Sequence, residues 1–374
     1  MQRFAHGTWM GFALCALWGC SAPPPPQPAA VPPATADAQL GRIVERYWDD
    51  LSRVQSVAPQ AVADSLALEK RYLAEVAAIA PGALSAESQL TREVFRRERV
   101  LGIEGYTYPA ELLPIDPFGG LPQRYAVEAP AALRLAASSP KEFAEWRDRA
   151  AAFTQWTQQA ILNMREGMRR GYTLPRVSVQ KILPQLALLG NDSPENSFYR
   201  ALGSGPSNAA LEDAVKRQIL PAYRDLHTFL SREYLPRARQ SIALSALPLG
   251  EAWYGHLANV ATGGARTPVQ LHALGLAELE RLRARVPAVL AQASFSGNAQ
   301  SFIEYMRTDP RFSYKSAAAL TGAYQDLKGQ LAAALPALFS ASPRAGFAIR
   351  DVEAFRQPVA ESLSYRPRSP DGLL

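Results

Sequence analysis

The chain has 374 residues, of which 48% are hydrophobic, so it is long enough for one large domain or two ordinary ones with a substantial core. Its 40 lysines and arginines stand against 34 acidic residues, so most of the positive charge is balanced and a nucleic-acid partner is not indicated. Both cysteines, Cys15 and Cys20, lie near the start, which excludes a disulfide framework or a cysteine-ligated metal in the rest of the chain.

The first 19 residues are typical of an export signal. Arg3 precedes an apolar run from about Trp9 to Trp18 that is too short to span a bilayer. The run ends Leu17-Trp18-Gly19-Cys20, which resembles the lipobox of bacterial lipoproteins, although Trp18 stands where a small residue is usual. An ordinary secretory signal cleaved nearby is the alternative to lipidation.

Cys20 is therefore the expected lipidation site, and the acyl chains would hold the protein at a membrane. Ser21 follows it in place of Asp, which resembles the sorting pattern for the outer membrane. The predicted location is the periplasmic face of the outer membrane. Residues 20–37 are rich in proline, which favours extended polyproline geometry, so they are predicted to be a linker.

Residues 38–374 are predicted to form a mainly helical domain. Ser139-Pro140-Lys141-Glu142 combines an N-cap, a first-position proline and a capping-box glutamate, and Gly171 is the expected C-cap of the long helix that follows. Thr267-Pro268-Val269-Gln270 is a second capped start, and Pro287 is expected to kink or break its helix. Other helices are predicted over roughly residues 39–57, 60–79, 87–104, 176–189, 208–235, 298–307 and 316–339.

Strand signals come late in the chain. Residues 346–352 alternate apolar and polar side chains, and residues 362–365 are a shorter candidate. The predicted fold is thus mainly α, with one or two C-terminal strands of an incomplete small sheet.

Side chains with the spacing of a metal or catalytic motif are not found. His227, His256 and His272 lack a His, Asp or Glu four residues further on, where a helix would place a second ligand, and no His-Glu pair occurs. The sequence therefore predicts no metal ligand and no catalytic residue. The arginines Arg96, Arg97 and Arg99 lie beside acidic residues, so they are interpreted as a solvated helix face and not as a phosphate site.

Six segments in order resemble the bacterial domain of unknown function 885 family, and the resemblance runs from about Gly41 to Gly372. The segments are Glu45-Arg46-Tyr47-Trp48, Tyr108-Pro109-Ala110-Glu111-Leu112-Leu113-Pro114, Asn163-Met164-Arg165-Glu166-Gly167-Met168-Arg169-Arg170-Gly171-Tyr172, Ala246-Leu247-Pro248-Leu249-Gly250, Leu271-His272-Ala273-Leu274-Gly275 and Arg307-Thr308-Asp309-Pro310-Arg311-Phe312.

The resemblance implies a zincin-like, mostly helical fold around a small sheet and the activity of a zinc-dependent peptidase. In such relatives a His-Glu-x-x-Pro-Gly-His segment and a later Glu would hold the metal. Here the sequence ends at Leu373-Leu374, where that segment is expected to follow. The resemblance therefore predicts a truncated, catalytically inactive chain, with zinc as a cofactor only of full-length relatives. The alternative is that the gene continues beyond Leu374 and that the intact protein is an enzyme.

The alternative function is that of a non-catalytic envelope scaffold or peptide-binding protein. The resemblance implies that the N-terminal helices wall a cleft, and it singles out Tyr254, His256, His272, Arg311 and Tyr314 as cleft-lining residues. Peptides and a membrane, reached through the lipid anchor, are the expected partners. The sequence makes no prediction of oligomeric state.

Overall fold

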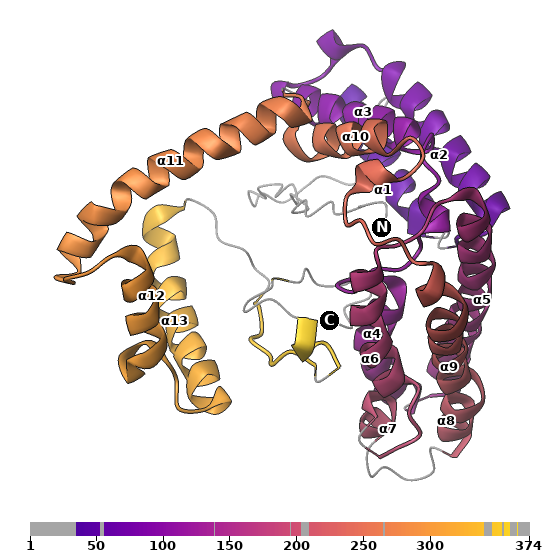
Figure 1. Cartoon of the computed structure of the whole chain (residues 1–374). Helices are drawn as coiled ribbons and strands as arrows, with labels where there is room; N and C mark the ends of the chain where they lie inside the picture. The colour runs from indigo at the N-terminus through magenta and orange to yellow at the C-terminus, as the bar shows by residue number, and fades with distance from the viewer. Residues whose placement is uncertain are drawn as a thin grey trace, which may run out of the picture. The chain divides into compact units, whose positions relative to one another are not determined.

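The helices of the chain group into two compact units (Figure 1). The computed structural model describes residues 35–52, 56–137, 139–194, 196–202, 209–264, 266–339, 346–353, 355–359 and 365. The first unit runs to Gly263 and takes in the residues from Pro358 onward, and the second is Gly264–Gln357. The mainly α prediction is confirmed. The predicted signal peptide, Cys20 and most of the proline-rich linker lie outside the described residues.

Three amphipathic helices open the first unit: α1 (Ala36–Ser52), α2 (Pro59–Ala77) and α3 (Ala86–Gly105). A short 3-10 turn, η1 (Pro81–Ala83), joins α2 to α3, and the Ser85 side chain caps α3 by accepting from the Ser88 amide. Their apolar faces bury one cluster, because residues three and four apart share a helix face. The cluster consists of Leu40, Ile43, Tyr47, Leu68, Tyr72, Val76, Ile79, Leu84 and Phe95.

The rest of the first unit is built around the 31-residue helix α5 (Pro140–Arg170). As predicted, Ser139 caps its start by accepting from the Glu142 amide, and Gly171 ends it with a left-handed φ of 82°. Its apolar face buries Trp146, Phe153 and Met164. The surrounding elements are η2 (Ala110–Leu112), α4 (Leu121–Ala136), α6 (Arg176–Leu189), α7 (Ser197–Leu202), α8 (Ala209–Ala214) and α9 (Leu220–Phe229).

The helix predicted over residues 208–235 is one helical run with two π-helical turns. These are η3 (Val215–Ile219) and η4 (Leu230–Tyr234), and the run ends in the 3-10 turn η5 (Leu235–Arg237). Pro221 and Pro236 each lie two residues after the last residue of a π turn. A proline lacks the amide hydrogen of the regular helix and clashes with the preceding turn, so a wider turn before it relieves the conflict.

The part of the first unit that precedes the second ends with η6 (Leu244–Ala246) and α10 (Gly250–Thr262). Gly250 lies against η6 so closely that a Cβ there would be 2.1 Å from the Leu244 carbonyl oxygen. Helix α10 also packs on α3 and ends at Gly263, whose φ is 78°. Neither α4 nor α10 was predicted from the sequence.

The second unit contains α11 (Pro268–Gln292), α12 (Ala299–Thr308), η7 (Pro310–Phe312) and α13 (Ala317–Leu338). The predicted start of α11 is confirmed, since Thr267 and Gln270 form a capping box. Helix α11 continues through Pro287 to Gln292, so of the two predicted effects, a kink or a break, the break does not occur. Few of this unit's large apolar side chains are buried among the described residues, and Leu290 is one of them.

The predicted strand over residues 346–352 was wrong. The segment has no strand partner among the residues that the structure describes. Two of its polar groups are bonded to α13 instead: Asp351 accepts from the Thr321 hydroxyl at 3.0 Å, and the Phe347 carbonyl accepts from Lys328. Residues 362–364 of the second predicted strand lie outside the described residues, and Tyr365 is not in a strand. Within the described part of the chain, the incomplete sheet is therefore absent.

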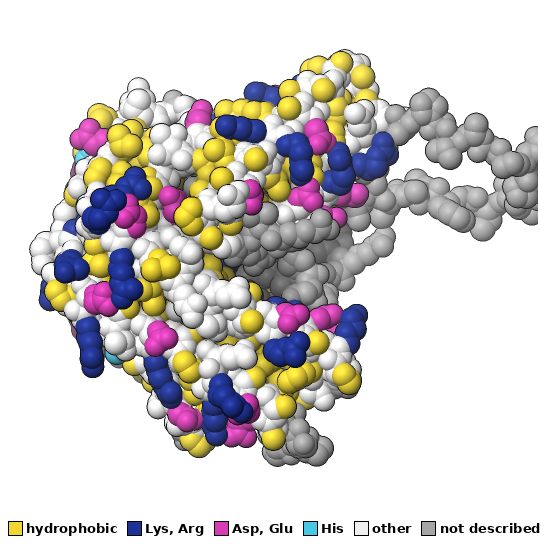
Figure 2. All heavy atoms as spheres, turned by 90° about the vertical axis from the view of Figure 1, so that its right-hand side faces the viewer, with side chains coloured by type: hydrophobic (Ala, Val, Ile, Leu, Met, Phe, Trp, Pro, Cys, Tyr) yellow, Lys and Arg dark blue, Asp and Glu magenta, His cyan; other side chains and the backbone are white. Residues whose placement is uncertain are grey.

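Two surface properties bear on possible partners. On the face shown in Figure 2, basic and acidic side chains are interspersed. Among the described residues, no helix combines the length and the apolar character needed to cross a bilayer.

Candidate functional site

The five residues predicted to line a cleft belong to both units. Tyr254 and His256 lie on α10 of the first unit, whereas His272 lies on α11 of the second, Arg311 in η7 and Tyr314 just after it. Tyr254 and His272 are exposed to solvent. Of the five, His256 and Arg311 make polar and aromatic contacts with neighbouring side chains.

His256 is packed at the junction of α3 and α10. Its side chain is 9% exposed, and its Nδ1 lies 3.7 Å from a carboxylate oxygen of Glu104. A Cβ on Gly105 would be 3.2 Å from Nε2, so glycine there leaves room for the ring. The ring also lies 5.4 Å from that of Tyr108, which in turn stacks on Trp253 at 5.6 Å.

Burial lowers the pKa of His256, and the Glu104 carboxylate only partly opposes this effect. The imidazole is therefore neutral at pH 7. Its neighbours are an aromatic stack and a single carboxylate, which is the environment of a side chain that holds two helices together.

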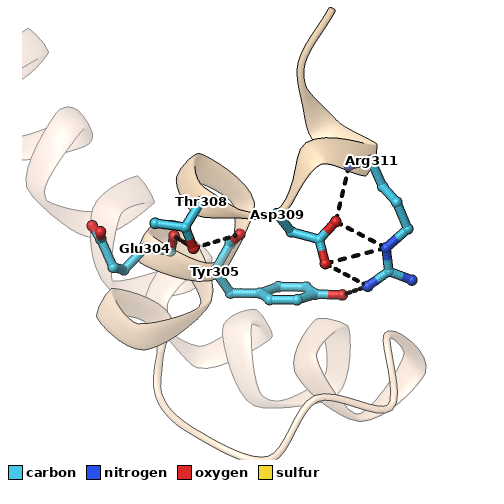
Figure 3. A network of polar contacts seen from close by, with 5 residues as sticks. All are labelled: Glu304, Tyr305, Thr308, Asp309 and Arg311. Atoms are coloured by element: carbon cyan, nitrogen blue, oxygen red, sulfur yellow. Dashed lines mark hydrogen bonds and ion pairs between the residues drawn. The ribbon is translucent and has the colours of Figure 1, made fainter.

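Arg311 belongs to an ordered polar network with Asp309 and Tyr305 (Figure 3). Its Nε donates to both carboxylate oxygens of Asp309, at 3.0 and 3.2 Å, and its Nη2 donates to Oδ2 at 2.8 Å and to the Tyr305 hydroxyl. Asp309 also accepts from the Arg311 backbone amide at 2.9 Å, which caps η7. The hydrogen bond from Arg311 lowers the pKa of Asp309 to about 2.

An aromatic row supports this network. Phe295 lies 5.0 Å from Phe302 and 5.2 Å from Tyr305, measured between ring centroids, and Tyr305 meets the Phe312 ring edge-on at 5.4 Å. Phe312 and Tyr314 are 51% and 57% exposed. The rings of Phe295 and Phe302 therefore hold the Tyr305 ring in place, and Phe312 lies beside Arg311 and is exposed to solvent.

A third polar cluster, which the sequence analysis missed, lies inside the three-helix layer. Glu69 of α2 accepts from Arg99 Nε at 2.6 Å and from the Tyr47 hydroxyl at 2.9 Å. The Arg99 guanidinium lies 3.8 Å from the centroid of the Tyr47 ring. The interpretation of Arg99 as part of a solvated face was wrong, because its side chain is only 6% exposed.

Burial raises the pKa of Glu69, and the charge of Arg99 opposes that rise. Tyr47, Glu69 and Arg99 come from three different helices, so the cluster fixes how those helices pack. The six-segment resemblance included Tyr47 but gave it no role. No local pattern connects Glu69 with Arg99, since they are 30 positions apart.

Two shallow hollows of about 280 and 380 Å³ lie side by side on α1 and α2 and share Arg46 and Glu75. Arg46 pairs there with Glu75 at 2.6 Å, and Tyr72 donates to Asp50 at 2.8 Å. Such exposed ion pairs contribute little stability.

No three His, Cys, Asp or Glu side chains of the described residues gather closely enough to hold a metal ion. Zinc in peptidases takes three protein ligands and a water, whereas the imidazole of His256 has the single carboxylate of Glu104 beside it. The described residues therefore do not fit the zinc ion that the family resemblance implies.

These features define a mainly helical protein with two ordered polar clusters and one exposed arginine network. The chain belongs to the family described as "Bacterial protein of unknown function (DUF885)", whose model matches residues 35–373. The predicted family is thereby confirmed. No curated protein matches this chain.

Proposed function

We propose that this chain is an exported, lipid-anchored envelope protein that binds peptides without hydrolysing them. The observation that carries the anchoring part is the position of Cys20, at the end of a short apolar leader and before a proline-rich segment. The first helix of the described residues begins at Ala36, soon after that segment. This order of leader, cysteine, spacer and folded body suits a protein tethered at a membrane surface.

The absence of hydrolysis is proposed because the three histidines that follow Cys20 do not form a ligand set. His256 packs between α3 and α10, His272 is exposed on α11, and His227 lies on α9. A zinc peptidase needs a bound ion to polarise the peptide carbonyl and to lower the pKa of a water. The described residues supply no such centre.

Binding of peptides is supported by the exposed Arg311 network. A guanidinium held in place beside exposed aromatic rings offers both a charged contact and an apolar contact to an extended chain. The peptidase activity that the sequence resemblance implies for full-length relatives is a second reason to propose peptides rather than nucleic acid as ligands.

Metabolic labelling with an alkyne analogue of palmitate tests the anchor. In a diderm bacterial host, the full-length chain should become labelled and sediment with outer membranes. Cys20→Ser should abolish the label, whereas Cys15→Ser, which changes the leader's other cysteine, should retain it. A wild-type chain that is unlabelled and released as a soluble periplasmic protein would contradict the anchoring proposal.

Metal analysis and a peptidase assay test the proposal that the chain binds peptides without hydrolysing them. The chain purified from membranes in detergent should contain no stoichiometric zinc and should bind peptides from a mixed library without cleaving them, as followed by mass spectrometry. Stoichiometric zinc together with cleavage would show that the chain is an enzyme.

A further inference from the structure

One edge of the Arg311 guanidinium is occupied and the other is open. A guanidinium carries five N–H donors in a planar fork. Nε and Nη2 of Arg311 donate to Asp309 and Tyr305, whereas Nη1 has no hydrogen-bond partner within the described part of the chain. The Arg311 side chain is 71% exposed and the Asp309 side chain only 19%. The network therefore holds the inner edge of Arg311, and Figure 3 shows the remaining guanidinium nitrogen, Nη1, pointing away from Asp309 and Tyr305.

The contacts of Asp309 and Tyr305 hold the Arg311 side chain, and with it the free Nη1 edge, in one position. Asp309 is fixed by capping η7, and Tyr305 is fixed by the rings of Phe295 and Phe302. An arginine held on one side loses less side-chain entropy when it binds a ligand than a freely rotating one. The N–H groups of Nη1 can donate charged hydrogen bonds to a carboxylate, and such bonds are among the stronger ones.

The side chains around this edge of Arg311 favour a ligand that carries an apolar group next to its carboxylate. The Phe312 ring lies 6.0 Å from the Arg311 guanidinium and is half exposed, and Tyr314 is exposed two residues further on. Lys315 follows Tyr314 in the sequence and is exposed, so it adds a positive charge to this segment. An anion with an adjoining apolar group would thus meet complementary charge and an aromatic surface together.

We propose that the Nη1 edge of Arg311, with the rings of Phe312 and Tyr314, binds the terminal carboxylate of a peptide whose last residue is aromatic or aliphatic. This inference rests on the proposed peptide-binding function and gives it a recognition point. Asp309 and Tyr305 are positioning residues, because they act through Arg311.

Fluorescence anisotropy with a matched pair of labelled peptides tests the inference. Both peptides end in phenylalanine, one as the free acid and the other as the amide, and both are titrated with the detergent-purified full chain. The free acid should bind at least about tenfold more tightly, because the amide loses a charged hydrogen bond. Arg311→Gln should abolish this preference.

Arg307→Gln is the matched control. Arg307 is as exposed as Arg311 and lies in the preceding turn, but its nearest acidic partner is Glu304 at 4.0 Å. It should keep the preference for the free acid, which separates a specific contact from general positive charge. Unchanged circular dichroism spectra would establish that both variants fold.

The possible outcomes separate the two proposals. Equal binding of acid and amide, or a preference that survives in Arg311→Gln, would overturn the role of Arg311 and leave peptide binding intact. Failure of every library peptide to bind would overturn both. Arg311-dependent binding to vesicles of anionic phospholipid, without any preference between the peptides, would also overturn the inference, since it would make the ligand a lipid headgroup.

Discussion

Glu69 on α2 and Arg99 on α3 form a buried ion pair, with 2.6 Å between the Glu69 carboxylate and Arg99 Nε. The pair lies within the layer formed by α1, α2 and α3, and a Cβ on Gly102 would be 3.2 Å from the same carboxylate. Glycine at position 102 therefore makes room for Glu69 to reach Arg99. The pair joins two helices that are neighbours in the chain.

Removal of one partner of this pair should be strongly destabilising. Glu69→Leu removes the buried carboxylate that Arg99 Nε donates to and leaves only the half-exposed Glu98 carboxylate, 3.6 Å from Nη2. Loss of one partner of a buried pair typically lowers the free energy of unfolding by about 3–5 kcal/mol. The double variant Glu69→Leu/Arg99→Met replaces both charges by apolar groups and should recover most of the loss. Urea unfolding followed by circular dichroism measures both, and a double variant as unstable as the single one would contradict this account.

The hydroxyl of Tyr47 should contribute to stability independently of its ring. Tyr47→Phe keeps the ring contacts with Tyr72 and Phe95 but removes the donor to Glu69. The expected loss is about 1–3 kcal/mol, because the bond is made to a buried charged group. Tyr254→Phe is the control, since Tyr254 is exposed and its variant should unfold at the same urea concentration as the wild type.

Two glycines of the same helix should respond in opposite directions to alanine. A Cβ at Gly250 would be 2.1 Å from the Leu244 carbonyl oxygen, so Gly250→Ala should lower the free energy of unfolding by about 1–3 kcal/mol. A Cβ at Gly255 meets nothing within 4 Å, so Gly255→Ala should raise it by about 0.5–1 kcal/mol through the better helix propensity of alanine. Thermal unfolding of the two variants beside the wild type decides the matter, and equal effects would show that α10 does not pack on η6 as described.

Helices with strong end signals were predictable from the sequence. The caps of α5 at Ser139 and Gly171 were located correctly, and so was the Thr267 start of α11, because capping side chains act on amides only a few residues away. Helix α4 was missed since Pro122 and Pro130 punctuate it, yet both fit inside one helix. Helix α10 was missed because it starts after Leu249 in a left-handed conformation without a side-chain cap, and packing on η6 and α3 stabilises it.

The polar clusters were less predictable than the helices. Periodicity showed that Arg99 lies on an amphipathic helix, but it did not show that Glu69 would meet it from another helix. Arg311 was selected only through the family resemblance. Its contact with Asp309 is local, two residues apart, whereas the support from Phe295 depends on how α11 and α12 pack. In the Glu69–Arg99 cluster and in the Arg311 network, the sequence did not predict the contacts between residues that are far apart in the chain.

The stability of the first unit should fall on acidification because of His256. Burial holds the folded-state pKa of His256 below the unfolded value of 6.5, so folding favours the neutral imidazole. This contribution is therefore fully present above the unfolded pKa and is lost as the pH falls through the folded-state pKa. Glu104, the nearest charged group, lies 3.7 Å away and reduces the loss without reversing it.

The measurement is the urea midpoint of unfolding between about pH 8 and pH 5, the range in which histidines titrate. His256→Gln should flatten the dependence over this range, because glutamine carries no titrating group. His272→Gln alters an exposed histidine and should leave the slope of the wild type unchanged. If the His256→Gln variant and the wild type lost stability in parallel, the imidazole between α3 and α10 would not be the group that titrates, and the neutral packing role assigned to it would be wrong.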